Sequence, residues 1–297
     1  MSHTPGRRLS LPFVFRGQRR FSVPLDLAVC QTTLTDVLAG NARELAVRPL
    51  PAGLDGHLLC GVIDQGWRTH SVLDDRVMYV VKRDVWHYLA WPGAYEAYLE
   101  GRFSAKTRES FARDEARFVE AFGVDGARLD LQAYCAPGEI ETFARYAAIV
   151  SPGYAPGSAV RDAAVEGRLH GLVLFAAGAP VAFVCLEAVG ETLQYMAGGE
   201  RDDFRQWSAG TIVHLAALRQ LFADGRFRFL DFRPGESEVK RQFANGSLRS
   251  AAVLQLKRNP FYRLLLGLHA LLQRQSDDNT ATQAVSEEIQ TLLGERA

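Results

Sequence analysis

The sequence predicts a two-domain α/β (α+β) protein in which mixed β-sheets are flanked by helices, and three observations support this. A chain of 297 residues is long for one hydrophobic core, because single cores stop growing at about 250–300 residues. Short apolar runs of strand length fill the first third, and a helical pattern covers residues 94–123. The second half alternates apolar strands with helices, as α/β folds do.

Composition narrows the class of protein. The chain is 47% hydrophobic and 23% charged, and its 34 basic residues balance 34 acidic residues. We therefore expect a globular protein with no bulk attraction to DNA or to an anionic membrane. The four cysteines are widely spaced and form no C-x-x-C motif, so no metal site is expected. Together with the lack of an apolar signal segment after the first arginines, this predicts a cytoplasmic protein.

Proline and glycine divide the N-terminal third into short elements. The apolar runs predict strands at residues 25–30, 44–50, 56–63 and 76–91 and a small helix at 32–40. The arm before Asp26 contains five arginines and no acid, and we interpret it as a solvated tail. In the helical segment, Lys106 shares a basic stripe with Arg113 and Arg117. This stripe is either an ordinary solvated helix face or a wall facing an anionic substrate.

The second half has a regular order of elements. Helices are predicted at 139–150, 208–225 and 236–243, and strands at 168–178, 180–190, 191–199, 227–232 and 247–259. The first two of these strands are apolar on both faces and are joined by a tight turn at 178–180, so we expect them in the centre of a sheet. The segment from residue 276 onward is predicted to be a polar tail with one weakly amphipathic end.

The stretch QWSAGTIV, residues 206–213, has the features of an anion-binding helix start. Ser208 can cap a helix whose first turn contains Gly210 and Thr211, and the amides of such a turn have no intrahelical partner. Unpaired amides and the helix dipole bind phosphate groups. Every helix has such an end, so an ordinary helix start is the alternative.

The stretch FRFLDFRPGESEVKRQF, residues 227–243, reads as a strand, a turn and a short helix. Asp231, Glu236 and Lys240 thus follow one another at the carboxyl end of a strand, where α/β folds collect functional groups. Asp231 alone is equally well explained as a turn cap or an arginine partner, and Glu236 with Lys240 as a surface helix pair. Together they supply what acyl transfer needs: a carboxylate to orient or deprotonate an acceptor and a cation to stabilise an oxyanion.

These motifs resemble the second half of the GNAT acyltransferase superfamily, and within it the CelD-like cellulose-biosynthesis acetyltransferases and the related FemAB-type transferases. The matching residues are Ser208, Gly210, Thr211, Asp231, Phe232, Gly235, Glu236, Lys240, Phe243 and Gly246, with Lys106 and Arg108 in the basic helix. The sequence departs from the family where a tyrosine is replaced by Val239 and a Gly-Arg pair by Arg233-Pro234. The Gln/Arg-x-x-Gly-x-Gly/Ala pyrophosphate signature is also missing.

The resemblance implies a tandem GNAT-like fold: a degenerate first half at 20–123, an acyltransferase half at 124–275 and the polar tail at 276–297. It implies acetyl-CoA or another acyl-CoA as co-substrate, with the acyl arm between the strands at 180–190 and 191–199. The pyrophosphate would lie on the turn formed by Ser208, Ala209, Gly210, Thr211 and Ile212. Lys240 would stabilise the tetrahedral intermediate, and Asp231 would orient or deprotonate an amine or hydroxyl acceptor.

Several further residues are candidates. Glu187 stands in an apolar strand, either as a second base or as a buried, paired glutamate. Tyr195 and Tyr154 can donate to a substrate oxygen or to the protein itself, and His70 and His87 are catalytic or structural. Lys106, Arg108, Glu236 and Tyr195 complete the expected substrate site. The segment 260–273 predicts an amphipathic helix that packs on the protein or contacts a membrane surface.

Two other functions remain open. FemAB-type enzymes use aminoacyl-tRNA as donor; the balanced charge argues against this, and the basic stripe argues for it. A non-catalytic GNAT-fold scaffold in polysaccharide or cell-envelope biosynthesis is the second. The acceptor, a small molecule or saccharide, is not determined by these motifs.

Overall fold

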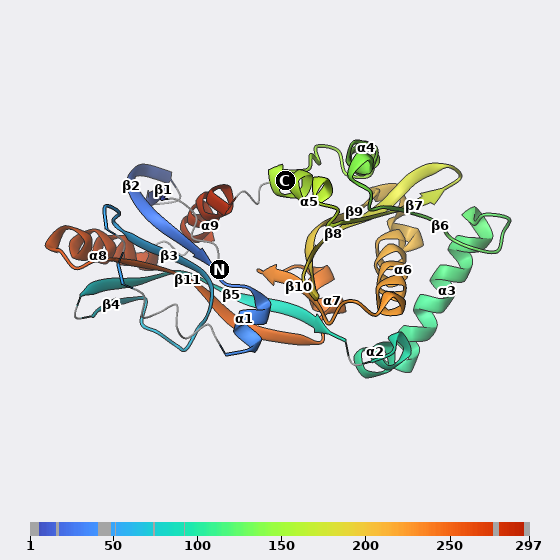
Figure 1. Ribbon diagram of the computed structural model, residues 1–297, viewed down its shortest axis with the longest axis horizontal. Helices are drawn as coiled ribbons and strands as arrows, with labels where there is room; N and C mark the ends of the chain where they lie inside the picture. The colour runs from blue at the N-terminus through green and yellow to red at the C-terminus, as the bar shows by residue number, and fades with distance from the viewer. Residues whose placement is uncertain are drawn as a thin grey trace. The chain divides into compact units, whose positions relative to one another are not determined.

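The computed structural model describes residues 6–15, 18–40, 49–50, 52–73, 75–91, 93–275 and 279–293, which form two compact units (Figure 1). Unit 1 contains Met1–Trp86, Pro234–Glu236 and Ser247–Arg296, and unit 2 contains His87–Arg233, Ser237–Gly246 and Ala297. These boundaries differ from the expected 20–123, 124–275 and 276–297. The reason is that two long strands, β5 (Arg76–Ala90) and β11 (Gly246–Lys257), each run from one unit into the other.

Unit 1 is built on a mixed array of strands. They are β1 (Arg7–Phe15), β2 (Gln18–Gln31), β3 (Gly56–Ile63), β4 (His70–Val72), β5 and β11. The order is β1-β2-β3-β11-β5, with β4 on β5. β2 pairs with β3 in parallel, whereas the pairs β1–β2, β3–β11 and β4–β5 are antiparallel. The strands predicted at 25–30, 56–63 and 76–91 are confirmed; most of the one predicted at 44–50 lies outside the described residues.

The N-terminal arm is a strand, so the prediction of a solvated tail is wrong. Leu9, Leu11 and Phe13 alternate along β1 and are buried in the core of unit 1. Alternate residues of a strand point to the same face. This period of two is visible in the sequence, but the arginines around it suggested a solvated segment.

Two long helices cover one face of the unit 1 strands. α8 (Pro260–Gln275) contacts β1 and β4, and α9 (Asn279–Leu293) contacts β1. Val285, Ile289 and Leu292 of α9 are buried in the same core as β1. The segment predicted as a polar tail is therefore an amphipathic helix over its described residues. A short helix, α1 (Leu34–Leu38), follows β2.

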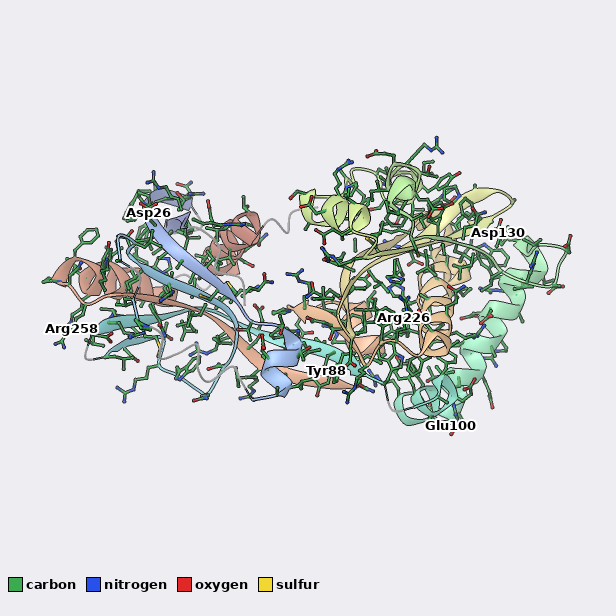
Figure 2. The ribbon with its side chains drawn as sticks, viewed as in Figure 1. Asp26, Tyr88, Glu100, Asp130, Arg226 and Arg258 are labelled. Atoms are coloured by element: carbon green, nitrogen blue, oxygen red, sulfur yellow. The ribbon has the colours of Figure 1, made fainter. Side chains whose placement is uncertain are left out.

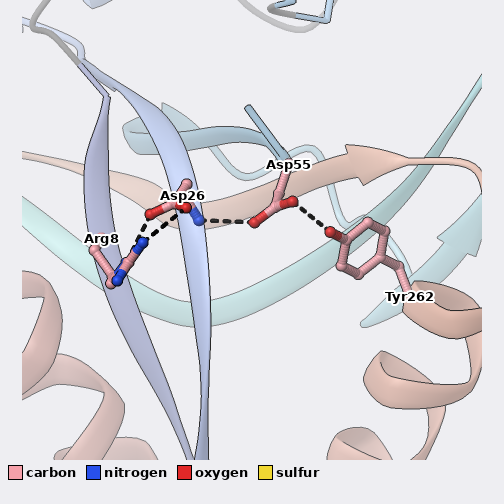
Figure 3. Close-up of polar contacts among 4 residues, drawn as sticks. All are labelled: Arg8, Asp26, Asp55 and Tyr262. Atoms are coloured by element: carbon pink, nitrogen blue, oxygen red, sulfur yellow. Dashed lines mark hydrogen bonds and ion pairs between the residues drawn. The ribbon is translucent and has the colours of Figure 1, made fainter. Parts of the chain in front are cut away.

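A chain of polar contacts fixes the start of α8 (Figure 3). The Tyr262 hydroxyl donates to the Asp55 carboxylate, which also accepts from the Asp26 amide at 2.8 Å. The Arg8 guanidinium donates to the Asp26 carboxylate at 2.8 Å and holds its pKa below the usual range. Burial, with the Asp55 hydrogen bond, raises the pKa of Tyr262 to about 12. Tyr262 is thereby held on the side of α8 that faces the strands.

The strands of unit 2 follow in the order β10-β9-β8-β7-β6 and, over the described residues, belong to the same mixed sheet as the strands of unit 1, so the expectation of two separate sheets is wrong. The strands are β6 (Asp130–Tyr134), β7 (Leu169–Ala176), β8 (Ala179–Val189), β9 (Thr192–Glu200) and β10 (Phe229–Pro234). Only β9 and β10 run parallel among the pairs described here. The mixed α/β class is confirmed.

Helices cover both faces of the unit 2 strands. α6 (Ala209–Asp224) lies on one face, and α4 (Ile140–Val150) and α5 (Ser158–Val165) lie on the other (Figure 1). The strands β7 and β8 are buried along most of their length, as predicted. Gly225, in the left-handed region with φ 68°, ends α6 as expected. None of the helices in the described part of the chain combines the length and the apolar character that a bilayer crossing requires.

Two local predictions for unit 2 need correction. The helix expected over 94–123 is divided into α2 (Tyr95–Arg102) and α3 (Ala105–Phe122), because Ser104 caps a new helix by accepting from the Thr107 amide at 3.2 Å. The tight turn between β7 and β8 consists of Ala177 and Gly178, with φ of 49° and 77°, one residue earlier than expected.

Gly56 provides a test of the β3–β11 contact. A Cβ at Gly56 would lie 1.9 Å from the carbonyl oxygen of Gln255 on β11, and a backbone atom cannot swing aside. We expect Gly56→Ala to lower the free energy of unfolding by about 3 kcal/mol. Gly267→Ala is the control, because nothing lies within 4 Å of its Cβ position in α8; it should raise stability by up to about 1 kcal/mol. Urea denaturation compares them, and equal midpoints would contradict the described contact.

Candidate functional site

The parallel strands β9 and β10 pair over only three residues. The register runs from Phe229↔Thr192 to Asp231↔Gln194, and β9 then continues to Glu200. In contrast, β8 and β9 pair from Val189↔Thr192 to Ala182↔Glu200, with one bulge. The prediction that an acyl arm lies between the strands at 180–190 and 191–199 is therefore wrong, since hydrogen bonds join these two strands. In unit 2 the pairing ends instead between β9 and β10.

Asp231 occupies the last paired position of β10. Its side chain is buried, 2% exposed, and accepts from the Arg233 amide at 2.7 Å. This contact two residues along the chain is a typical aspartate turn. It places Arg233 in the left-handed region, with φ 64°, which is costly for a residue other than glycine. Burial lowers the pKa of Arg233, and Asp231 opposes this shift. The structure thus combines the turn-cap and arginine-partner alternatives for Asp231.

Lys240 reaches the same turn from the other side. It lies in α7 (Glu238–Phe243), and its Nζ donates to the Arg233 carbonyl at 3.1 Å. The backbone of Arg233 therefore donates its N–H to the Asp231 carboxylate and accepts from the Lys240 ammonium at its carbonyl oxygen. The predicted carboxylate and ammonium thus both contact Arg233 at the end of β10. In the sequence, Arg233 was noted only because Arg233-Pro234 replaces the Gly-Arg pair of the family. Glu236 is exposed in the connection before α7.

Glu187 is a paired glutamate. Its register partner in β9 is Gln194, the same residue that is opposite Asp231, so both carboxylates lie on one face of the strands. Glu187 is 12% exposed and forms an ion pair with Arg168. A carboxylate held by a guanidinium is a weak base, so the geometry favours the paired-glutamate alternative.

Tyr195 lies on the opposite face and contacts a histidine that the sequence analysis missed. Its hydroxyl is 3.3 Å from Nε2 of His214 on α6, whose Nδ1 is 2.6 Å from the Gly210 carbonyl. A carbonyl only accepts, so Nδ1 carries the hydrogen and the Tyr195 hydroxyl donates to Nε2. Burial lowers the pKa of His214 to about 4 and raises that of Tyr195. A lone histidine among the apolar residues of TIVHLAAL was the available signal.

The start of α6 is already occupied by carboxylates of this chain. The Gly210 amide donates to Glu200 at 2.8 Å. Ser208 does not cap the helix as predicted: it has a left-handed φ of 56°, and its hydroxyl donates to Asp114 at 3.1 Å. Neither Glu200 nor Asp114 was predicted. Within the five-residue turn Ser208, Ala209, Gly210, Thr211 and Ile212, the structure therefore confirms the helix start, and it places acids beside it.

The basic helix contributes a different residue from those expected. Lys106 is exposed at the beginning of α3, and Arg108 pairs at 3.4 Å with Glu100 of α2; Figure 2 labels Glu100. Arg117, further along α3, lies over the Trp207 ring at 4.9 Å and donates to the Gln206 carbonyl just before α6. Among the residues of this basic helix, Arg117 is the one whose contacts place it beside the start of α6, where Arg205 also pairs with Glu200 at 3.9 Å.

Tyr154 has a hydroxyl suited to a ligand. The oxygen is buried and, apart from the neighbouring Cys185 thiol, has no hydrogen-bond partner within the described chain. Burial and the neighbouring Cys185 thiol raise the pKa of Tyr154, so the hydroxyl stays protonated and can donate. Its ring packs on Phe183 of β8. Among the described side chains, no three His, Cys, Asp or Glu residues are grouped so as to hold a metal ion.

The chain is similar to known acetyltransferases over this region. The family described as "Acetyltransferase (GNAT) domain" matches residues 153–241, which include β7 to β10, Asp231 and Lys240. No curated protein sequence matches the chain.

The chain is also similar to solved structures at low sequence identity. FemX is 10% identical, with a TM-score of 0.50 over 88% of this chain and 91% of that chain. The C-terminal domain of a lysylphosphatidylglycerol synthetase, described as putative, from Agrobacterium fabrum is 12% identical, with a TM-score of 0.48 over 83% and 81%. A GCN5-related N-acetyltransferase from Kribbella flavida is 15% identical, with a TM-score of 0.33, and the chain spans 60% of its length. The fold is GNAT-like, and CelD-like specificity stays a prediction.

The buried His214 makes stability depend on pH. Its folded pKa of about 4 lies below the unfolded value of about 6.5. The contribution is therefore complete above pH 6.5 and is lost as pH falls toward 4, by up to about 3 kcal/mol. We expect His214→Gln to flatten this part of the profile, measured by urea denaturation across that range. Parallel profiles for parent and variant would show that His214 is solvated.

Proposed function

We propose that the protein is an acyltransferase whose reacting carbonyl lies at the carboxyl end of β10. The observation that carries this proposal is the pair of contacts on Arg233, where the Asp231 carboxylate and the Lys240 ammonium meet beside the end of the β9–β10 pairing. Strand ends of this kind collect ligands in α/β folds. The same segment lies within the match to the acetyltransferase domain.

The reaction is direct transfer within a ternary complex. The acceptor amine or hydroxyl attacks the thioester carbonyl, the C–S bond breaks, and the thiolate leaves with the proton released by the acceptor. The Lys240 ammonium stabilises the oxyanion. Asp231 acts as a positioning residue, because its contact with Arg233 sets the strand end from which Lys240 is held. The buried hydroxyl of Tyr154 is a candidate donor to the leaving sulfur.

The donor in this proposal is acetyl-CoA or another acyl-CoA, with its pyrophosphate at residues 208–212. Gly210 supports a close approach of the phosphate to the backbone. The Glu200 carboxylate on the Gly210 amide must then leave when the donor binds. Lys106 and Arg108 lie at the start of α3, whereas Arg117 lies next to this turn. Arg117 therefore takes the anion-facing role in our proposal.

The same Glu200 contact favours a second candidate, an aminoacyl-tRNA-dependent transferase. An aminoacyl ester presents no pyrophosphate to α6, so Glu200 could keep its place on the Gly210 amide. FemX shares the fold over most of both chains. In this candidate Lys240 keeps its role, because the ester carbonyl develops the same oxyanion. The acceptor is an amine or hydroxyl of a small molecule or saccharide in both cases.

Lys240→Gln tests the catalytic assignment. We expect kcat to fall by about two to three orders of magnitude, because one oxyanion donor is lost, while KM for the donor changes little. The readout is CoA release from acetyl-CoA with a panel of amines and sugars, or transfer from aminoacyl-tRNA. Arg241→Gln is the control, since this exposed cation of the same helix lies outside the proposed site. Parent-like turnover of Lys240→Gln, with both variants folded, would refute the role of Lys240.

Glu200→Gln separates the two donors. If the CoA pyrophosphate binds at α6, removing the competing negative charge should tighten CoA binding about tenfold, measured by calorimetry. Glu191→Gln is the matched control, because it removes an exposed carboxylate at the other end of β9. No CoA binding by either variant, together with transfer from aminoacyl-tRNA, would replace the first candidate by the second.

A further inference from the structure

Exposed apolar side chains gather on the outer side of α8 and at the end of β4. Five large hydrophobic residues in this region are between 39% and 74% exposed: Val72, Phe261, Leu264, Leu268 and Leu271. We call this surface the α8 face. A contiguous apolar patch on a protein surface marks a binding site more often than scattered single residues do.

The α8 face follows from the apolar pattern of the helix. Phe261, Leu264, Leu268 and Leu271 are spaced by three and four residues and form one helical stripe. The opposite stripe, with Leu265 and Leu266, is buried in the core of unit 1. The helix is therefore apolar on both sides, whereas an ordinary surface helix has a polar outer side.

Buried polar contacts prevent α8 from turning its outer stripe inward. The Tyr262 hydroxyl is held by Asp55 (Figure 3). His269, two residues before Leu271, accepts from the Tyr79 hydroxyl at 2.6 Å and donates to the Pro12 carbonyl at 3.1 Å. Rolling the helix would leave these buried groups without partners.

A groove of about 750 Å³ with a cationic rim runs along this face. Its apolar floor contains Leu264, Leu268 and Leu271, and its polar lining includes His70, Arg258 and Arg263. Figure 2 shows Arg258 beside α8 and β4. The Nε2 atom of His70 is buried and has no hydrogen-bond partner in the described part of the chain. The groove therefore offers apolar surface, positive charge and one unsatisfied polar atom together.

The charges beside the α8 face favour an anionic occupant. The α8 sequence PFYRLLLGLHALLQRQ contains two arginines and no acidic residue. Arg258, just before the helix, and Arg68, on the segment leading to β4, are exposed as well. The nearby exposed Asp75 is paired with Arg76 at 2.7 Å. An apolar stripe flanked by arginines is typical of helices that lie in the surface of an anionic bilayer.

We propose that the α8 face binds the surface of an anionic lipid bilayer. The leucines and Phe261 enter the boundary between headgroups and acyl chains, and α8 lies flat in the membrane plane. The arginines contact lipid phosphates. This membrane contact uses residues of unit 1 and does not depend on the reaction proposed for unit 2.

The test is cosedimentation of the full chain with lipid vesicles. We expect binding to vesicles of phosphatidylcholine mixed with phosphatidylglycerol, and weak binding to phosphatidylcholine alone. Leu264→Glu with Leu268→Glu should reduce the bound fraction about tenfold or more. The matched control is Ile149→Glu with Val165→Glu, two exposed hydrophobics of unit 2 with similar exposure, 49% and 72% against 74% and 42%, which should bind like the parent. Circular dichroism confirms that all variants are folded.

A second pair of variants tests the charge contribution. Arg68→Gln with Arg263→Gln should weaken binding to the anionic vesicles about tenfold and reduce its dependence on salt. Equal binding of the parent and of Leu264→Glu with Leu268→Glu would overturn the proposal. So would a parent that ignores vesicles but forms dimers that the leucine substitutions dissociate, because the α8 face would then bind a second copy of this chain.

Discussion

The contact between the Asp231 carboxylate and the Arg233 amide determines the geometry of the candidate site in unit 2. A buried carboxylate needs partners, because an uncompensated charge in the interior is costly. The 2.7 Å bond to Arg233 supplies one and bends the chain out of β10 through a left-handed residue. That bend directs the Arg233 carbonyl toward Lys240 and begins the turn into α7. The short β9–β10 pairing, the turn and the ammonium are thus parts of one local arrangement.

The start of α6 shows why a phosphate-binding motif must be judged by what surrounds it. Helix amides attract any anion, including a carboxylate of the same protein. Glu200 stands at the end of β9, and the Gly210 amide takes it at 2.8 Å. In the proposed reaction, a diphosphate at this position would compete with this intramolecular ligand, so the affinity for an acyl-CoA donor would depend on the cost of moving Glu200. The end of β10, with Asp231 and Lys240, therefore supports the proposal of acyl transfer more directly than the start of α6, where Glu200 already holds the Gly210 amide.

Each unit contains a buried tyrosine–histidine–carbonyl arrangement. Tyr195 donates to His214 in unit 2, and Tyr79 donates to His269 in unit 1; burial lowers the pKa of each histidine to about 4. Their recurrence argues for a structural role in both units, since a neutral imidazole satisfies a hydroxyl and a carbonyl at once. In unit 1 this contact also fixes the orientation of α8, and the outer apolar stripe of the helix is exposed as a consequence.

The sequence by itself determined the local elements of this protein. Period-two and helical patterns, the glycine after α6 and the strand–turn–helix at 227–243 each depend on residues a few positions apart. They therefore predicted most elements and placed Asp231 and Lys240 on one strand–turn–helix segment. The tertiary structure alone decided which strands lie side by side and which acids find partners. Glu187 meets Arg168, Glu200 meets Gly210, and β9 parts from β10 rather than from β8. Such contacts join distant positions, and no periodicity records which of several compatible partners a side chain meets.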